Sequence, residues 1–384
     1  MIKKKKVFRD KSFNVSFFSH QITSADKKAM MNALNGSLLT DGPLLGKFES
    51  AFSKFTGAKY AIGVSNATSA LHLSIKALGI KKGDEIIIPD ITFVATANAV
   101  RLGGAIPVLA SVDDDLNISI KSIKENLSSK TKAILPVHMA GNVCNIDGVT
   151  DIARSHNLKV IEDCAHAIGA KHNNKHVGNF GDAGCFSFYP TKNITTIEGG
   201  MVITNNSEIA DYVRSARNHG ITQSLSQRYS NGKPWDYDII ESGYNYRLDE
   251  IRSSLGLSQL KRISRLNLLR QKAFEYYNKE LKKIPGIIPP NISQETNNAY
   301  HLYIIKIENA YKLSRDELFE KFSESGISTT VHYKPLHTFS AFKKAIHRTS
   351  LDDVEKLYDQ IISLPLYPHI SKKEQDLVIK CIKS

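Results

Sequence analysis

Seven short runs of β-branched and aliphatic residues recur between about residues 60 and 205, and stretches with helical spacing separate them. The runs are 61–64, 85–88, 106–109, 132–135, 159–161, 184–188 and 201–204. Strands of this length that alternate with helices are typical of a mainly parallel sheet with helices on both faces. We therefore predict an α/β protein. Ligands of such sheets bind at the carboxyl ends of the strands, so we expect the chemistry in the polar residues that follow each run.

The chain has 384 residues, which is more than one compact core usually holds. We predict a large domain over residues 1–262 and a smaller C-terminal α/β domain over residues 263–384. Helical patterns at 246–261, at 314–325 and after Ser371, with a strand at 301–305, support this division. Residues 223–242 lack periodicity and are predicted to form a long loop of the kind that often serves function.

The composition argues against several classes of protein. The formal net charge is +13, but outside Lys3–Lys6 the basic residues are scattered among acidic ones, and no nucleic-acid-binding motif accompanies them. No apolar run approaches the roughly 20 residues of a membrane-spanning helix, and no signal-peptide pattern follows the basic start. The four cysteines stand apart without CxxC spacing. We therefore expect no nucleic-acid, membrane or metal partner, and a cytoplasmic location.

Three polar residues follow neighbouring predicted strands in the two most informative segments. Asp163 comes two residues after the run 159–161, Ser187 lies in the run 184–188, and Lys192 follows that second run, 29 residues after Asp163 (192 − 163). Pyridoxal phosphate needs a carboxylate to keep its ring nitrogen protonated, hydroxyl and amide groups for its phosphate, and an amine for its aldehyde. Taken singly, such a lysine is usually a surface residue and such an aspartate a helix cap.

The order and surroundings of these residues resemble the DegT-type (DegT/StrS) sugar aminotransferases, which have the aspartate-aminotransferase fold, fold type I of the pyridoxal-phosphate enzymes. The resemblance covers nearly the whole chain, and the segments that carry it, in the order of that family, are 40–43, 64–73, 88–98, 136–141, 160–170, 184–200, 243–251 and 331–333. It implies pyridoxal 5'-phosphate, alternating with pyridoxamine 5'-phosphate, as the cofactor. It further implies L-glutamate and a nucleotide-linked keto-deoxysugar as substrates, and a homodimer with shared active sites.

The resemblance also assigns the catalytic residues. Lys192 would carry the cofactor as a Schiff base and, once displaced, move the proton during transfer. Asp163 would pair with the ring nitrogen. His166 would contact the ring or its 3'-hydroxyl, although packing at a strand end is the alternative. His166 matches members of the family that act on 4-keto sugars, whereas several 3-keto enzymes carry Gln there, so we favour the 4-keto position.

Further residues would bind the cofactor. Ala67 and Thr68 open a predicted helix whose positive end suits a phosphate, and Ser187 would add a hydroxyl. Ala67 stands where the family often has Gly. Phe93 would stack on the ring, or else belong to the core. Asn245 would reach the phosphate from the partner subunit.

The substrate residues that the resemblance suggests are His332, Tyr333, Arg228 and Lys233, which would face the nucleotide diphosphate or lie on an ordinary surface. Ile197 stands where the family often has Gly, which leaves the local backbone open. Four alternatives remain: a 3-keto sugar, a keto-inositol, a sugar dehydratase, or a non-catalytic protein that binds the cofactor or a sugar. Dehydratases of this group replace the lysine with His, so Lys192 weighs against that reading.

Overall fold

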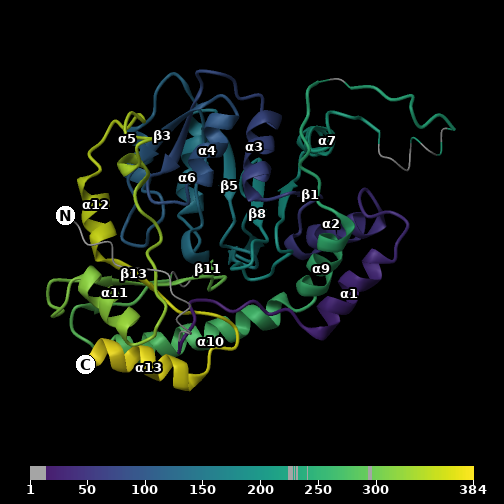
Figure 1. Ribbon diagram of the computed structural model, residues 1–384. Helices are drawn as coiled ribbons and strands as arrows, with labels where there is room; N and C mark the ends of the chain where they lie inside the picture. Colours follow the sequence, from purple (N-terminus) through teal and green to yellow (C-terminus); the bar gives the residue numbers. More distant parts are fainter. Residues whose placement is uncertain (1–13, 224–227, 229, 231, 240, 293–295) are drawn as a thin grey trace, which may run out of the picture.

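The computed structural model describes residues 14–384 except 224–227, 229, 231, 240 and 293–295. A seven-stranded sheet with the order β1-β9-β8-β5-β4-β2-β3 forms its centre (Figure 1). The strands are β1 Tyr60–Val64, β2 Glu85–Pro89, β3 Ile106–Ala110, β4 Thr131–Ile134, β5 Lys159–Asp163, β8 Ala183–Ser187 and β9 Gly200–Thr204. All pairs are parallel except those of β9 with β1 and β8. The predicted α/β class and all seven predicted runs are confirmed.

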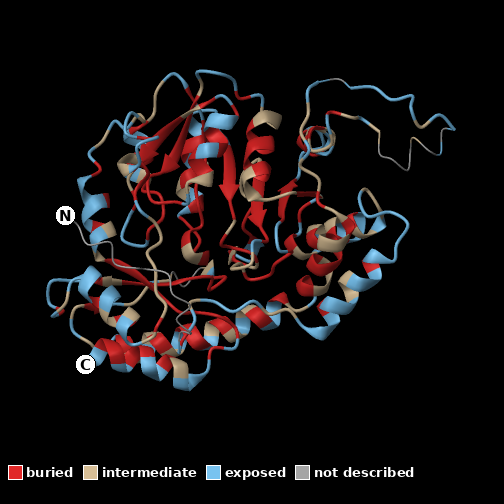
Figure 2. Ribbon diagram, viewed as in Figure 1, coloured by how far each residue is buried: buried red, intermediate tan, exposed pale blue. Residues whose placement is uncertain are grey.

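Side chains alternate across the sheet because successive residues of a strand point to opposite faces. In β2, Ile86 and Ile88 belong to one buried cluster and Ile87 to the other. Helices pack against both clusters, so the strands are buried on both sides while the helices expose their outer faces (Figure 2). This double burial explains why the strands read as continuous apolar runs.

Helices of the large domain divide between the two faces. On one face lie α3 Ala67–Ala77, α4 Ala95–Leu102 and α7 Ser207–Ala216, and on the other lie α2 Pro43–Thr56, α5 Ile120–Glu125, α6 Ile146–Ser155 and α9 Glu250–Leu260. Helix α1 Ser24–Leu34 packs along α9, and a 3₁₀ turn spans Met139–Gly141.

Helix α9 begins at Glu250 and not at residue 246 as predicted. The N–H of Tyr246 donates to the Arg217 carbonyl, and the Tyr246 carbonyl accepts from the Ser65 N–H, so this backbone is extended. Asp249 then caps the helix by accepting from the Arg252 N–H.

The smaller unit contains a three-stranded antiparallel sheet in the order β10-β12-β13. Its elements are α10 Ile263–Leu281, β10 Ile287–Ile288, β12 Tyr303–Ile307, α11 Arg315–Glu324, a 3₁₀ turn Leu336–Thr338, α12 Asp352–Gln360, β13 Ile361–Leu364 and α13 Lys372–Lys383. The predicted helices near 314–325 and after Ser371 are present, with Ser314 and Ser371 as their N-caps. A small sheet of β6 Lys171–His172, β7 Lys175–His176 and β11 Thr296–Asn297 joins the two units.

The division at residue 262 stays a proposal, because two segments cross it. Val15 packs in the core of the smaller unit, and the segment that carries Phe342 and Leu351 packs in a core cluster of the large sheet. Among the described residues, no helix is long and apolar enough to cross a membrane.

The segment between α7 and α9 leaves the body of the molecule as an extended arm (Figure 1). Ile221 and Ile239 pair across its base, and the Thr222 N–H donates to the Asp238 carbonyl at 3.4 Å. Trp235, with 74% of its surface exposed, lies on the arm.

Candidate active site

The carboxyl ends of three strands bring the predicted residues together at one edge of the sheet. Asp163 is the last residue of β5 and lies opposite Cys185 of the parallel strand β8, and Ser187 ends β8. Lys192 follows five residues later, in the loop that leads to β9. Helix α3 begins just after β1, at the same edge.

Asp163 is buried, and each of its carboxylate oxygens has one donor. Oδ1 accepts from the Ala165 N–H at 3.0 Å, and Oδ2 accepts from the Thr96 hydroxyl at 2.9 Å. Burial raises the pKa of Asp163, while these two hydrogen bonds and the Lys192 charge oppose the shift. The site therefore holds a carboxylate ready to pair with a cation.

Lys192 lines a narrow cavity of about 50 Å³. The other lining residues are Thr191, Phe17 and Phe18, and six residues of the smaller unit: His301, Leu302, His332, Tyr333, Leu364 and Leu366. Burial lowers the pKa of Lys192 to about 8, and the charge of Asp163 works against that shift. An amine with this pKa is partly neutral near pH 7.5, as a nucleophile or base must be.

The first turn of α3 offers a phosphate site. Asn66 caps the helix through the Ser69 N–H, which leaves the amides of Ala67 and Thr68 without a hydrogen bond to any described residue. Gly200, opposite Ser187, touches this turn so closely that a Cβ there would lie 2.5 Å from the Asn66 carbonyl carbon. Ala67 has ordinary helical backbone, so the missing Gly costs nothing here.

The protonation of His166 follows from its partners. The Ala140 N–H donates to Nδ1 at 3.3 Å, so in the neutral ring Nε2 carries the hydrogen and donates to the Tyr333 hydroxyl at 3.2 Å. Burial holds the pKa of His166 well below its usual value. His166 is thus a buried, neutral hydrogen-bond donor, and its role toward the cofactor stays a proposal.

Phe93 is 55% exposed, which excludes the core alternative, and its ring centroid lies 5.7 Å from that of Tyr333. His332 is held by the Ser363 hydroxyl at 2.8 Å and by stacking on Phe17, and burial lowers its pKa to about 3. Since His332 and Tyr333 line the Lys192 cavity, they are not ordinary surface residues.

Sequence reasoning missed His301, which it assigned to a strand over 301–305. The strand β12 begins at Tyr303, because the amides of His301 and Leu302 both donate to the Ala140 carbonyl. The His301 imidazole instead lines the cavity, 4.6 Å from the His166 ring, and its Nδ1 contacts the Asn193 amide oxygen at 3.1 Å. No periodicity signals such a residue.

Arg228 and Lys233 belong to the segment that forms the arm, and neither of them lines the Lys192 cavity. Arg228 stacks on Tyr237, with 4.7 Å between its guanidinium carbon and the ring centroid. Asn245 is exposed where the arm returns to the body, and it pairs with Asn218.

Ile197 keeps the left-handed backbone that a glycine would favour, with φ of 71°. The Thr195 hydroxyl accepts from the Ile197 N–H at 2.8 Å, and the Thr196 hydroxyl donates to the Glu198 carbonyl at 2.8 Å. These bonds hold the turn beyond Lys192 despite the β-branched side chain.

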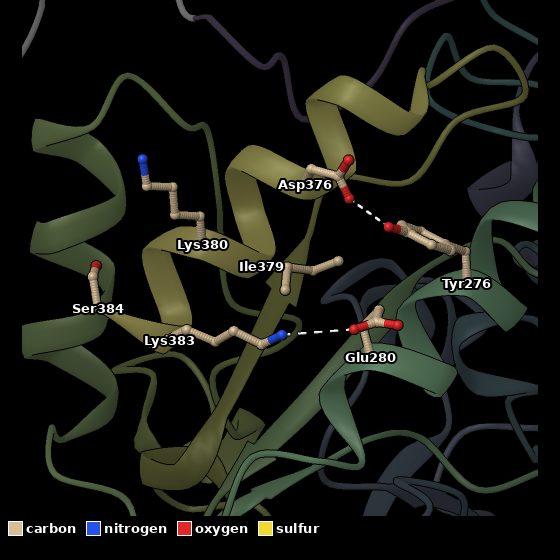
Figure 3. A pocket seen from close by; sticks show the side chains of 7 residues that line it. All are labelled: Tyr276, Glu280, Asp376, Ile379, Lys380, Lys383 and Ser384. Atoms are coloured by element: carbon tan, nitrogen blue, oxygen red, sulfur yellow. Dashed lines mark hydrogen bonds and ion pairs between the residues drawn. The ribbon is translucent and has the colours of Figure 1, made fainter.

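Two other features near or far from the site do not add to it. In a hollow between α10 and α13 on the smaller unit, Tyr276 pairs with Asp376 and Lys383 pairs with Glu280 (Figure 3). Behind Asp163, buried His138, Glu162 and Cys164 lie within reach of a common metal ion. The Glu162 carboxylate already accepts from three backbone amides and contacts His138 at 3.0 Å. Its oxygens are therefore satisfied by protein groups without a metal ion.

The residues at the sheet edge fit pyridoxal phosphate. Lys192 would supply the amine, Asp163 the carboxylate, and the α3 turn with Ser187 the phosphate donors. The close approach of Gly200 to Asn66 keeps that turn against the end of β8.

Comparison with known proteins agrees with this geometry. The sequence model of the DegT/DnrJ/EryC1/StrS aminotransferase family matches residues 20–383. SpsC, the spore coat polysaccharide biosynthesis protein of Bacillus subtilis, is 36% identical over 355 residues, 91% of each chain. Helicobacter pylori PseC, an aminotransferase of pseudoaminic acid biosynthesis, has a TM-score of 0.90 at 32% identity and covers 97% of this chain and 98% of its own. The PLP form of Spr1654 from Streptococcus pneumoniae has a TM-score of 0.88 at 28% identity, with 97% and 98% covered.

Proposed function

The chain belongs to the DegT/DnrJ/EryC1/StrS family of pyridoxal-phosphate-dependent sugar aminotransferases, and we propose that it transfers the amino group of L-glutamate to the 4-keto carbon of a nucleotide-linked deoxysugar. The observation that carries the proposal is the convergence of Lys192 and Asp163 at one sheet edge, beside a phosphate-binding helix turn. When bound, pyridoxal phosphate supplies an electron sink for the carbon that gains or loses a proton.

The chain's own residues supply the rest of the chemistry. Lys192, with its lowered pKa, takes the proton from the donor and returns it to the acceptor. Asp163 keeps the ring nitrogen protonated, and Phe93 covers the ring. His166 Nε2–H donates to the Tyr333 hydroxyl, which orients the Tyr333 proton to donate to an oxygen atom beside the reacting carbon. The net charge of +13 favours the approach of an anionic sugar nucleotide.

We expect L-glutamate alone to convert the absorbance of bound pyridoxal phosphate to that of the pyridoxamine form, and a 4-keto sugar nucleotide to restore it. Product mass should rise by one amino group in place of the keto oxygen. A parallel screen with 3-keto sugars and keto-inositols tests the position of the ketone. If the cofactor binds and glutamate leaves the spectrum unchanged, the alternative of a non-catalytic binding protein is favoured.

A dehydratase is the less favoured enzyme, because Lys192 is present where dehydratases of this group carry His. The name of SpsC refers to a spore coat polysaccharide, and we propose by analogy that the amino sugar made here enters a cell-surface polysaccharide. A cytoplasmic location, where sugar nucleotides are made, stays part of the proposal.

We also propose a homodimer in which Asn245 of one subunit reaches the phosphate site of the other. Asn245 is exposed at the base of an arm that carries the exposed side chains Trp235, Tyr237 and Ile239. Large apolar side chains on a projecting arm are typical of a surface that a partner covers. Arg228 and Lys233, on the same arm, would then approach the nucleotide of the partner's site.

A mixing experiment tests the shared site. Lys192→Ala and Asn245→Ala homodimers should each be impaired, whereas mixed dimers regain one complete site, with Lys192 from one subunit and Asn245 from the other. We expect activity after subunit exchange well above the sum of the two variants, and a dimer in sedimentation equilibrium. An active monomer, or a mixture no better than its parts, would contradict the shared site.

A further inference from the structure

Two buried threonines form a chain of hydroxyl groups that ends on Asp163. The hydroxyl oxygens of Thr92 and Thr96 lie 2.9 Å apart, and Thr96 Oγ1 lies 2.9 Å from Asp163 Oδ2. Both threonine side chains are almost fully buried. Thr96 lies in the first turn of α4, and Thr92 lies in the segment that leads into this helix. The Thr96 N–H donates to the Phe93 carbonyl at 3.1 Å, which folds this segment back towards the helix.

The direction of the hydrogen bonds follows from the number of protons. A carboxylate only accepts, so Thr96 gives its single hydroxyl proton to Asp163 Oδ2. Thr96 can then only accept from Thr92, which gives its own proton to Thr96. Because Oδ1 accepts from the Ala165 N–H, each oxygen of Asp163 is held by one donor.

We propose that Thr96, oriented by Thr92, is a positioning residue that holds Asp163 as an ionised carboxylate facing the ring nitrogen of the cofactor. The inference rests on the proposed site, to which it adds a residue that touches neither cofactor nor substrate. The same short segment carries Phe93, so it supplies both the ring that covers the cofactor and the donors behind its carboxylate.

The electrostatics of the pocket make such donors necessary. Burial alone raises the pKa of Asp163 and favours the neutral acid, which could not stabilise a protonated ring nitrogen. The hydrogen bond from Thr96 lowers the pKa and opposes burial. Chains of hydrogen bonds strengthen one another, so Thr92 adds to the donor strength of Thr96.

Three single substitutions test this role. Thr96→Val keeps the shape but removes the donor, and we expect cofactor affinity to fall about tenfold at pH 8. The loss of affinity should grow as the pH falls towards 6, because a larger fraction of Asp163 becomes protonated when its raised pKa is no longer opposed by Thr96. The absorbance of the bound cofactor should also titrate at a higher pH than in wild type. Thr96→Ser keeps the donor and should restore affinity, and Thr92→Val should lose only about two- to threefold.

A double-mutant cycle separates this role from simple packing. In an Asp163→Asn background, Thr96→Val should no longer change cofactor affinity, because no charge remains for the hydroxyl to stabilise. An equal loss in both backgrounds, a Thr96→Ser variant no better than Thr96→Val, or wild-type affinity and titration in Thr96→Val would each overturn the inference. Failure of the wild type itself to bind the cofactor would instead refute the proposed site.

Discussion

Replacing Lys192 with alanine should reduce amino transfer by about 10⁴-fold, the upper range for a positioned proton-transfer group, and leave the fold intact. At pH 7.5 an amine with a pKa of about 8 is roughly one quarter neutral, against about one part in a thousand for an exposed lysine. Alanine removes both the nucleophile that captures the cofactor and this base. Single-turnover kinetics with L-glutamate, on protein supplied with excess pyridoxal phosphate, measure the loss.

The fold should not suffer, because the amine of Lys192 makes no hydrogen bond or ion pair with any described residue. Its pKa is lower in the folded than in the unfolded chain, so the buried charge costs stability below about pH 8, and that cost is gone above about pH 10.5. Cofactor-free Lys192→Ala should therefore unfold at a slightly higher temperature than cofactor-free wild type at pH 7, and at a similar temperature near pH 11.

Two matched variants sharpen the result. Lys192→Arg keeps a cation but cannot bind the cofactor covalently and should be as inactive as the alanine variant, whereas Lys59→Ala, at an exposed position before β1, should behave as wild type. Turnover by Lys192→Ala within tenfold of wild type would remove the mechanism proposed for this lysine.

The parts of the fold that could be predicted from the sequence are those governed by short-range patterns. The run Ile86–Ile88 is apolar throughout because both faces of the parallel sheet are covered. Ser314 and Ser371 mark helix starts through their own hydrogen bonds. The start of α9 was misplaced because backbone bonds from Tyr246 to distant Arg217 and Ser65 override the helical pattern.

The same distinction applies to the site. The meeting of Asp163, Ser187 and Lys192 could be predicted because Asp163 and Ser187 end neighbouring strands and Lys192 follows the second of them. His301 and Thr96 could not be predicted, because their places in the site depend on contacts with residues far away in the sequence. His301 contacts Ala140 and Asn193, and Thr96 contacts Asp163. Arg228 and Lys233 lie on an arm whose destination is a second subunit in our proposal, which no single chain can reveal.

Replacing Asp163 with asparagine should slow amino transfer by about 10²–10³-fold, as expected for loss of one preorganised electrostatic partner. The variant keeps the shape of the side chain, but a neutral amide cannot stabilise a protonated ring nitrogen, so the bound cofactor becomes a weak electron sink. Single-turnover rates with L-glutamate and the pH dependence of the cofactor absorbance report the change. A normal rate in this variant would refute the pairing of Asp163 with the ring.

The hydroxyl chain explains why this substitution should not damage the fold. The Ala165 N–H is a fixed donor, so the oxygen of the asparagine side chain must face it. The amide nitrogen must then donate to the Thr96 hydroxyl, and this hydroxyl turns so that it donates to Thr92. Because burial raises the pKa of Asp163 in the folded chain, its charge costs stability at neutral pH, and this cost disappears below about pH 4. Cofactor-free Asp163→Asn should thus be at least as stable as wild type at pH 7 and lose that advantage in acid, in thermal unfolding followed by circular dichroism. A variant that unfolds more readily at pH 7 would mean that the carboxylate supports the fold and does not serve the cofactor alone.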